Sequence, residues 1–171
     1  LKRVAAKETS DYIRSLHISN GVKIKEAIGL DKLEIVGEKV LSASLTDGSD
    51  VNVDFVIVGI GITPNTELAE DANLKINNGI LINDKCQTSV SNIYAAGDCT
   101  SFEYKNILVR LESVGNAIDQ ATVVAQNIMK KNINYIPKPW FWSDQYDLKL
   151  QIAGLNTGYD DVIVRKGESK Q

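Results

Sequence analysis

A glycine and a carboxylate close a run of small residues at Tyr94-Ala95-Ala96-Gly97-Asp98. In an open α/β sheet, ligands lie beyond the carboxyl ends of the strands, and a glycine at that point lets a cofactor approach the backbone. The carboxylate of Asp98 can then accept hydrogen bonds from the hydroxyl groups of a sugar or a polyol. The pentapeptide alone is equally compatible with an ordinary Gly-Asp turn at the end of a strand, so its surroundings must decide.

Two neighbouring features favour a cofactor site over a plain turn. The segment Phe55–Val58 is apolar at every position, as in a strand that is covered on both faces, and it ends in Gly59-Ile60-Gly61. A predicted helix starts at Ser113, about 15 residues after Asp98. Because a helix N-terminus carries partial positive charge, its first residues can stabilise an anionic part of a ligand.

The elements that must position these residues follow from the apolar pattern and the turn residues. Helices are predicted over residues 7–20, 66–74 and 113–130. An antiparallel meander is predicted from strands over residues 22–25, 33–36 and 41–45. Further strands are predicted over residues 55–58, 79–82, 93–96, 148–153 and 161–165. This alternation of helices and apolar strands predicts an α/β fold.

The helix over residues 113–130 is expected to contribute most to the core. Its apolar residues recur at helical spacing and predict one buried stripe: Ala117, Ala121, Val124 and Ile128, widened by Ile118, Ala125 and Met129. The segment after it, residues 135–139, contains two prolines and is expected to be a stiff, non-helical connector between domains.

With these motifs in place, the sequence resembles the FAD-dependent pyridine nucleotide oxidoreductases that contain two dinucleotide-binding domains. Residues 56–65 look like the strand with which that family crosses from its NAD domain to its FAD domain, and residues 88–99 look like its second FAD motif. Residues 110–117 and 139–145 are similar to the ferredoxin and rubredoxin reductases that serve oxygenases and cytochromes P450, the branch of the putidaredoxin and rhodocoxin reductases.

The resemblance implies roles for residues around the second FAD motif. In the family, the aspartate at the position of Asp98 holds the ribityl chain of FAD, and Gly97 precedes it. The backbone amide near Val114, at the helix start formed with Ser113, is implied to meet the pyrimidine edge of the flavin. Gly115 stands where the family commonly has proline, which loosens this helix start.

The resemblance also implies two catalytic residues and two further cofactor-binding glycines. Glu112 and Trp142 are expected to border the nicotinamide and the flavin, and Trp142 also counts as cofactor-binding. Taken singly, a tryptophan such as Trp142 is more often a packing residue than a cofactor contact, and Glu112 is usually a carboxylate that favours a helix start. Gly59 and Gly61 are expected to allow close approach of the cofactor at the crossing strand.

The family layout predicts three domain segments. Residues 1–58 correspond to the tail of the NAD(P)-binding domain, residues 59–132 to the second half of the FAD-binding domain, and residues 133–171 to the start of an α+β C-terminal interface domain. No GxGxxG fingerprint occurs, and the chain opens with Leu1 rather than Met. The sequence is therefore expected to be a fragment, inactive by itself because half of the FAD cradle is absent.

The implied function of the parent protein is that of an oxidoreductase. It passes hydride from NAD(P)H to FAD and then single electrons to a ferredoxin or a rubredoxin. One alternative keeps the fold and uses a small-molecule acceptor, as in NADH oxidases, monodehydroascorbate reductases or nitrite reductase-like flavoproteins. A second alternative is a non-catalytic binding module.

Composition argues against several other classes. The net charge is −3 with a pI near 5.2, which gives no electrostatic footprint for nucleic acid or an anionic membrane. The longest apolar stretch, Phe55–Ile62, is far shorter than the roughly 20 residues of a spanning helix. Cys86 and Cys99 are interpreted as structural thiols, and with the single His17 they cannot form a standard zinc site. A cytoplasmic protein is expected.

Overall fold

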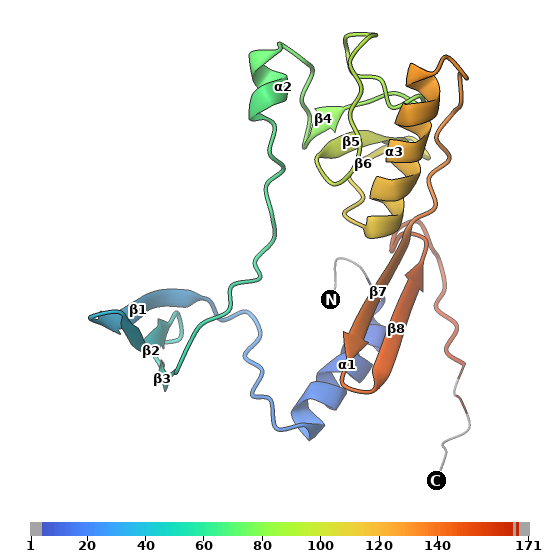
Figure 1. Cartoon of the computed structure of the whole chain (residues 1–171). Helices are drawn as coiled ribbons and strands as arrows, with labels where there is room; N and C mark the ends of the chain where they lie inside the picture. Colours follow the sequence, from blue (N-terminus) through green and yellow to red (C-terminus); the bar gives the residue numbers. More distant parts are fainter. Residues whose placement is uncertain (1–4, 166, 168–171) are drawn as a thin grey trace. The chain divides into compact units, whose positions relative to one another are not determined.

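The computed structural model describes residues 5–165 and 167. Its described residues divide into two units, one made of the described parts of Leu1–Gly61 and Asp161–Gln171 and the other of Ile62–Asp160 (Figure 1). The second unit contains the second FAD motif identified in the sequence.

The first unit begins with helix α1 (Lys7–Ser19), which confirms the predicted helix. Asn20 caps its C-terminus, and Gly21 follows with a φ of +83°. The strand predicted over residues 22–25 is wrong, because these residues are exposed and no described strand pairs with them. The guanidinium of Arg14 instead holds the following segment through the carboxylate of Glu26, at 2.7 Å.

An antiparallel meander completes the ordered part of the first unit. It consists of β1 (Leu30–Val36), β2 (Lys39–Leu45) and β3 (Asp50–Asn52), paired in that order. Gly37 and Gly48, at the two turns, have φ values of +63° and +79°, which glycine adopts without strain. The predicted antiparallel three-stranded meander is confirmed, but its third strand is β3 and not residues 22–25.

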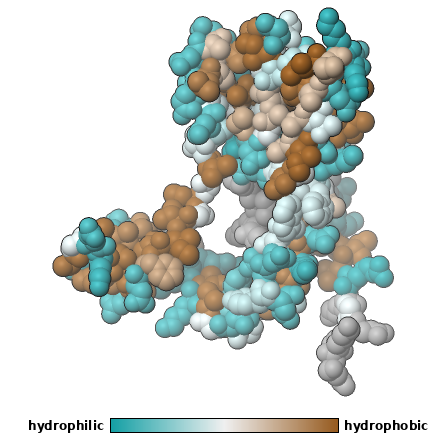
Figure 2. Space-filling model, in the orientation of Figure 1, coloured by the Kyte–Doolittle hydropathy of each residue, from teal (hydrophilic) through white to brown (hydrophobic). Residues whose placement is uncertain are grey.

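The segment Phe55–Val58 is not a strand, contrary to the prediction. Phe55 is 72% exposed and Ile57 84% exposed, and no described strand pairs with this segment. Figure 2 shows apolar surface over the meander and along the stretch that follows it. An apolar strand of a parallel sheet needs strands on both sides and helices on both faces, and the described residues supply neither here.

The second unit is built around a small mixed sheet. Helix α2 (Glu67–Asp71) confirms the predicted short helix and precedes the strands. Strand β4 (Ile80–Leu81) runs parallel to β5 (Thr100–Tyr104), and β5 pairs antiparallel with β6 (Ile107–Val109). The strand predicted over residues 93–96 is reduced to a single bridge between Gln87 and Tyr94, because the next residues turn away at Gly97.

Helix α3 (Val114–Ile128) lies beside this sheet (Figure 1). The fully packed core between them comprises Ile82, Cys86, Phe102, Leu111, Val123 and Tyr135. The rings of Phe102 and Tyr135 meet edge to face with centroids 5.4 Å apart. The core therefore joins the sheet, the helix and the connector that follows the helix.

The buried face of α3 is not the predicted apolar stripe. Its buried residues are Asn116, Gln120, Val123 and Asn127. Ile118, at 60% exposed, and Met129, at 73%, lie on the exposed surface. The polar residues are buried because each side-chain amide satisfies backbone groups of the surrounding loops, which apolar side chains cannot do.

Asn127 illustrates how these amides hold the loops. Its Nδ2 donates to the carbonyl oxygens of Lys85, at 3.0 Å, and Ile133, at 2.8 Å. Its Oδ1 accepts from the backbone N–H of Ile133 at 2.6 Å. One side chain thus ties the end of α3 to the loop after β4 and to the connector.

A two-stranded hairpin ends the second unit. Strands β7 (Trp140–Gln145) and β8 (Leu148–Ala153) are antiparallel, and β8 coincides with the predicted strand. The connector over residues 135–139 is non-helical, as predicted. The strand predicted over residues 161–165 is wrong, because these residues are exposed and pair with no described strand.

Replacement of Gly79 by alanine is expected to destabilise the chain by about 1–3 kcal/mol. Gly79 has a φ of +128°, and an added Cβ would lie 2.7 Å from the carbonyl oxygen of Cys99. Gly115→Ala is the matched control, since its added Cβ meets nothing within 4 Å and alanine favours the helix. Urea denaturation measures both variants, and equal stability of Gly79→Ala and the parent chain would contradict the prediction.

The stability of the chain is expected to fall as pH rises from about 9 to about 11. Burial raises the pKa of the Cys86 thiol from 9.0 to about 11. Across this window the unfolded chain releases a proton that the folded chain retains, and the loss amounts to about 1–3 kcal/mol. Cys86→Ala should reduce the pH dependence of urea midpoints, most clearly between about pH 9 and 10, whereas Cys99→Ala should not. Above about pH 10 the buried Tyr135 hydroxyl, whose pKa is also raised, contributes to the same loss. An unchanged slope in Cys86→Ala would show that another group is responsible.

Candidate functional site

The Gly97-Asp98 turn is anchored to helix α3 by one buried glutamine. The Gln120 Oε1 accepts a hydrogen bond from the backbone N–H of Gly97 at 2.7 Å and from the hydroxyl of Thr100 at 3.0 Å. The Thr100 hydroxyl is also 2.8 Å from the carbonyl oxygen of Gly97. Gln120 and Thr100 are completely buried, so this network fixes the turn within the core.

Gly97 is required by the backbone of this turn. Its φ of +89° lies in the left-handed region, and an added Cβ would lie 3.6 Å from the Cβ of Ala117. The turn therefore packs directly against the first turns of α3. The side chain of Asp98 is exposed, and none of the described hydrogen bonds or ion pairs uses its carboxylate.

Arg110 links Asp98 to Glu112. Its Nη1 donates to the carbonyl oxygen of Asp98 at 3.3 Å, and its Nη2 lies 2.7 Å from the Glu112 Oε1. The side chain of Arg110 is only 10% exposed and that of Glu112 is 30% exposed. Two carboxylate-bearing residues predicted for the site are thereby joined through one guanidinium.

The N-terminus of α3 provides free backbone donors beside these residues. Ser113 is the N-cap, and its side chain accepts a hydrogen bond from the backbone N–H of Asn116 at 3.3 Å. The N–H groups of Val114 and Gly115 have no acceptor within the helix, because the first turn lacks preceding carbonyls. No acidic side chain lies in this first turn, so the positive end of the helix is not neutralised there.

A second buried network supports this helix start. The Asn116 Nδ2 donates to the carbonyl oxygen of Leu111 at 3.0 Å, and the Tyr135 hydroxyl donates to the Asn116 Oδ1 at 2.5 Å. Burial raises the pKa of the Tyr135 hydroxyl, so it remains a neutral donor at ordinary pH. The backbone that leads into α3 is therefore held from the core side.

The remaining predicted residues belong to other elements of the chain. Trp142 lies on the exposed face of β7, where its ring stacks on that of Trp140 with centroids 5.1 Å apart. Gly59 and Gly61 lie in the exposed stretch that follows β3, in the other unit. Their roles in cofactor binding stay predictions, as does the role of Trp142.

Sequence reasoning gave no role to three residues that shape this site. Arg110, Asn116 and Gln120 make the contacts that position the predicted residues. The sequence does carry a signal for Asn116 and Gln120. Together with Asn127 they form a row of side-chain amides on one face of the helix. No local pattern marks Arg110, whose partners are decided by the fold.

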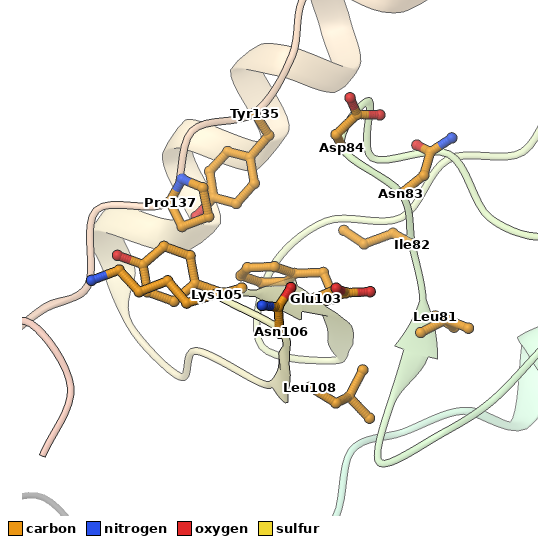
Figure 3. Close-up of a pocket in the computed structure, with 12 residues that line it drawn as sticks. Leu81, Ile82, Asn83, Asp84, Glu103, Lys105, Asn106, Leu108, Tyr135 and Pro137 are labelled. Atoms are coloured by element: carbon orange, nitrogen blue, oxygen red, sulfur yellow. The ribbon is translucent and has the colours of Figure 1, made fainter. Parts of the chain in front are cut away.

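A separate cavity of about 650 Å³ lies between the connector and the edge of the β4–β5–β6 sheet (Figure 3). Tyr135 and Pro137 lie on its connector side, and Glu103 and Leu108 come from the sheet. None of the predicted site residues lines it. The cavity is therefore distinct from the Asp98 cluster, by which we mean Gly97, Asp98, Arg110, Glu112 and the first residues of α3.

The described residues contain neither a metal-binding cluster nor a membrane-spanning helix. No group of three or more His, Cys, Asp or Glu side chains is arranged to hold a metal ion in that part of the chain. Within the same residues, no helix is long and apolar enough to cross a membrane.

Comparison with known families decides which fold surrounds the Asp98 cluster. Residues 1–121 match the pyridine nucleotide-disulphide oxidoreductase family. The chain belongs to this family. Residues 140–171 match a second family, described as the reductase C-terminal domain. The predicted α/β fold of a two-dinucleotide-domain flavoprotein reductase is confirmed, and FAD and NAD(P)H are the cofactors expected of the pyridine nucleotide-disulphide oxidoreductases.

Curated relatives of this chain include rhodocoxin, putidaredoxin and ferredoxin reductases. Rhodocoxin reductase of Rhodococcus erythropolis is 37% identical over 96% of the chain, and putidaredoxin reductase of Pseudomonas putida is 41% identical over 96% of it. A solved putidaredoxin reductase–putidaredoxin complex covers 98% of the chain at 41% identity, with a TM-score of 0.92. The chain spans 39–40% of the two curated relatives and 41% of the solved chain.

Gln120→Leu is expected to destabilise the chain by about 1–3 kcal/mol, because it leaves the buried N–H of Gly97 without an acceptor. Gln120→Glu retains an acceptor oxygen but should not recover the loss, because it places a carboxyl group, whose second oxygen has no partner among the described residues, in a completely buried position. Thr122→Ala is the control on the exposed side of α3, with an expected change within about 0.5 kcal/mol. Urea denaturation compares the three variants, and a Gln120→Leu chain as stable as Thr122→Ala would contradict the assigned contact.

Proposed function

We propose that the protein to which this chain belongs is an NAD(P)H-dependent flavoprotein reductase that delivers electrons to a ferredoxin or a rubredoxin. The observation that carries the proposal is the Asp98 cluster. A free carboxylate, a glycine in the left-handed region and an unneutralised helix N-terminus lie together in the second unit. The relatives named above support the same class of reductase.

The residues of the cluster fit the two ends of a flavin with its ribityl chain. The Asp98 carboxylate is exposed and has acceptor capacity that none of the described residues uses. The N–H groups of Val114 and Gly115 can donate to the pyrimidine edge of the flavin. Gly97 presents no Cβ at the approach to the turn. FAD, when bound, accepts hydride and releases electrons singly.

The residues of this chain are proposed to bind the flavin and the nicotinamide and to orient them. Ser113 and Val114 place the positive end of α3 where negative charge on the flavin ring is stabilised by on the order of 0.3–1 kcal/mol. Glu112 can accept a hydrogen bond from the nicotinamide carboxamide. Arg110 neutralises this carboxylate at 2.7 Å, so it can lie beside the flavin without an unpaired charge.

Trp142 is proposed to exclude water from the site of hydride transfer. Its ring is 48% exposed, and Trp140 supports it from one side at 5.1 Å. Half-exposed aromatic rings on a hairpin offer a flat apolar face at little cost in conformational freedom. Gly59 and Gly61 are proposed to let the cofactor approach the crossing strand.

The domain division stays a proposal: residues 1–58 as the tail of the NAD(P)-binding domain, 59–132 as the second half of the FAD-binding domain, and 133–171 as the start of the C-terminal interface domain. The family matches over residues 1–121 and 140–171 support the last boundary. The first stretch of the first structural unit ends at Gly61, close to the first proposed boundary, which supports it.

The electron acceptor is proposed to be a small iron–sulfur protein or a rubredoxin. The relatives are named as reductases of such carriers, and one solved structure is a complex with its carrier. These names give no support to the small-molecule acceptors or to a non-catalytic binding module. Cytoplasmic location is proposed because both Cys86 and Cys99 are free thiols, which fits a reducing compartment.

Asp98→Asn in the protein that contains this chain is expected to weaken FAD binding by about 10- to 100-fold, since a charge-assisted hydrogen bond contributes roughly 1.5–3 kcal/mol. Titration of the apoprotein with FAD, followed by flavin fluorescence, measures the dissociation constant. Asp84→Asn is the matched control, because Asp84 is an exposed acid of the same unit outside the cluster.

An Asp98→Asn protein that binds FAD as tightly as the Asp84→Asn protein would contradict the proposed ribityl contact.

The electron acceptor is tested separately, by stopped-flow reoxidation of the reduced protein. Rapid reoxidation by a ferredoxin or rubredoxin, and slow reoxidation by oxygen or nitrite, is expected. The reverse order would favour a small-molecule acceptor.

A further inference from the structure

The guanidinium of Arg110 contacts both acidic residues of the Asp98 cluster. Both terminal nitrogens of its guanidinium have partners, the Asp98 carbonyl oxygen at 3.3 Å and the Glu112 carboxylate at 2.7 Å. Its Nε is buried without a partner among the described residues. Burial of a guanidinium costs free energy that a solvent-exposed arginine would not incur.

The fold makes specific room for this side chain. An added Cβ on Gly79 would lie 3.2 Å from the Cδ of Arg110 and 2.7 Å from the carbonyl oxygen of Cys99. The absence of a side chain at Gly79 thus lets the arginine stem pass over the start of β4. Arg110 is held by packing as well as by its two polar contacts, and this restricts where its guanidinium can lie.

The two partners of Arg110 belong to different parts of the chain. Asp98 belongs to the turn that Gln120 anchors at Gly97, whereas Glu112 immediately precedes the N-cap of α3. Nothing in local sequence fixes the spacing between a turn and a helix start. A bridging guanidinium does fix it, because its donors have a rigid planar geometry.

We propose that Arg110 is a positioning residue that sets the Glu112 carboxylate relative to the Gly97-Asp98 turn, and thereby sets the nicotinamide relative to the flavin. This inference rests on the proposed function. Asp98 holds the flavin side of the site and Glu112 the nicotinamide side, so the bridge fixes the distance over which hydride moves. Arg110 itself touches neither reacting atom.

The test uses the FAD-loaded protein that contains this chain, with Arg110→Met, Arg110→Lys, Glu112→Gln and the double variant Arg110→Met/Glu112→Gln. Loss of the bridge is expected to slow flavin reduction by NADH by about 10- to 100-fold, because small displacements of reacting groups have effects of that size. FAD content should remain that of the parent. Lys105→Met is the control, a cation on the exposed turn between β5 and β6.

Two further readouts separate positioning from general damage. Equilibrium binding of NAD⁺ to the oxidised protein should weaken in Arg110→Met and in Glu112→Gln. The double variant should bind NAD⁺ about as tightly as whichever single variant binds it less tightly. Arg110→Lys should recover little, since an ammonium cannot reach both oxygens with fork geometry. If Arg110→Met does not retain FAD, Arg110→Lys is judged by the same criteria.

Parent-like flavin reduction in Arg110→Met, or multiplicative effects of the two single substitutions, would overturn the role of Arg110 alone. A parent protein that binds no FAD, or whose FAD is not reduced by a pyridine nucleotide, would instead overturn the proposed function. The unmodified protein therefore distinguishes the two failures before any variant is compared.

Discussion

The second unit depends on the buried amide face of α3. Gln120, Asn116 and Asn127 point their side chains into the core and satisfy backbone groups of three separate loops. A buried backbone N–H or C=O without a partner costs roughly 1–3 kcal/mol, so loss of any of these contacts would destabilise the loop that it holds. With strands as short as β4, hydrogen bonds from one helix replace the ladder that a larger sheet would provide.

This constraint also explains why the candidate site is preorganised. Gln120 holds the Gly97-Asp98 turn from inside, Asn116 and Tyr135 hold the backbone that enters α3, and Arg110 joins the two from the outer side. The groups left unpaired among the described residues are the Asp98 carboxylate and the first N–H groups of α3, and these are the groups that we propose face the cofactor. Rigid support with free donors and acceptors is the arrangement that cofactor binding requires.

Apolar periodicity proved a weaker guide than polar periodicity in this chain. The stripe that contains Ile118 and Met129 predicted the core face of α3, yet these residues are exposed. Phe55–Val58 likewise has the pattern of a buried strand and lies exposed. Such a pattern indicates a surface suited to being covered, but the covering element must come from elsewhere in space, which a local pattern does not specify.

The sequence by itself determined the local features: the extents of α1 and α3, the hairpin turns, strand β8, the proline connector and the Gly97-Asp98 turn. These depend on propensities, caps and backbone requirements that act over a few residues. Only the tertiary structure decided which face of α3 is buried and that Arg110 joins Asp98 to Glu112. Those choices depend on hydrogen-bond partners distant in sequence, whose positions are set by the packing of the whole unit.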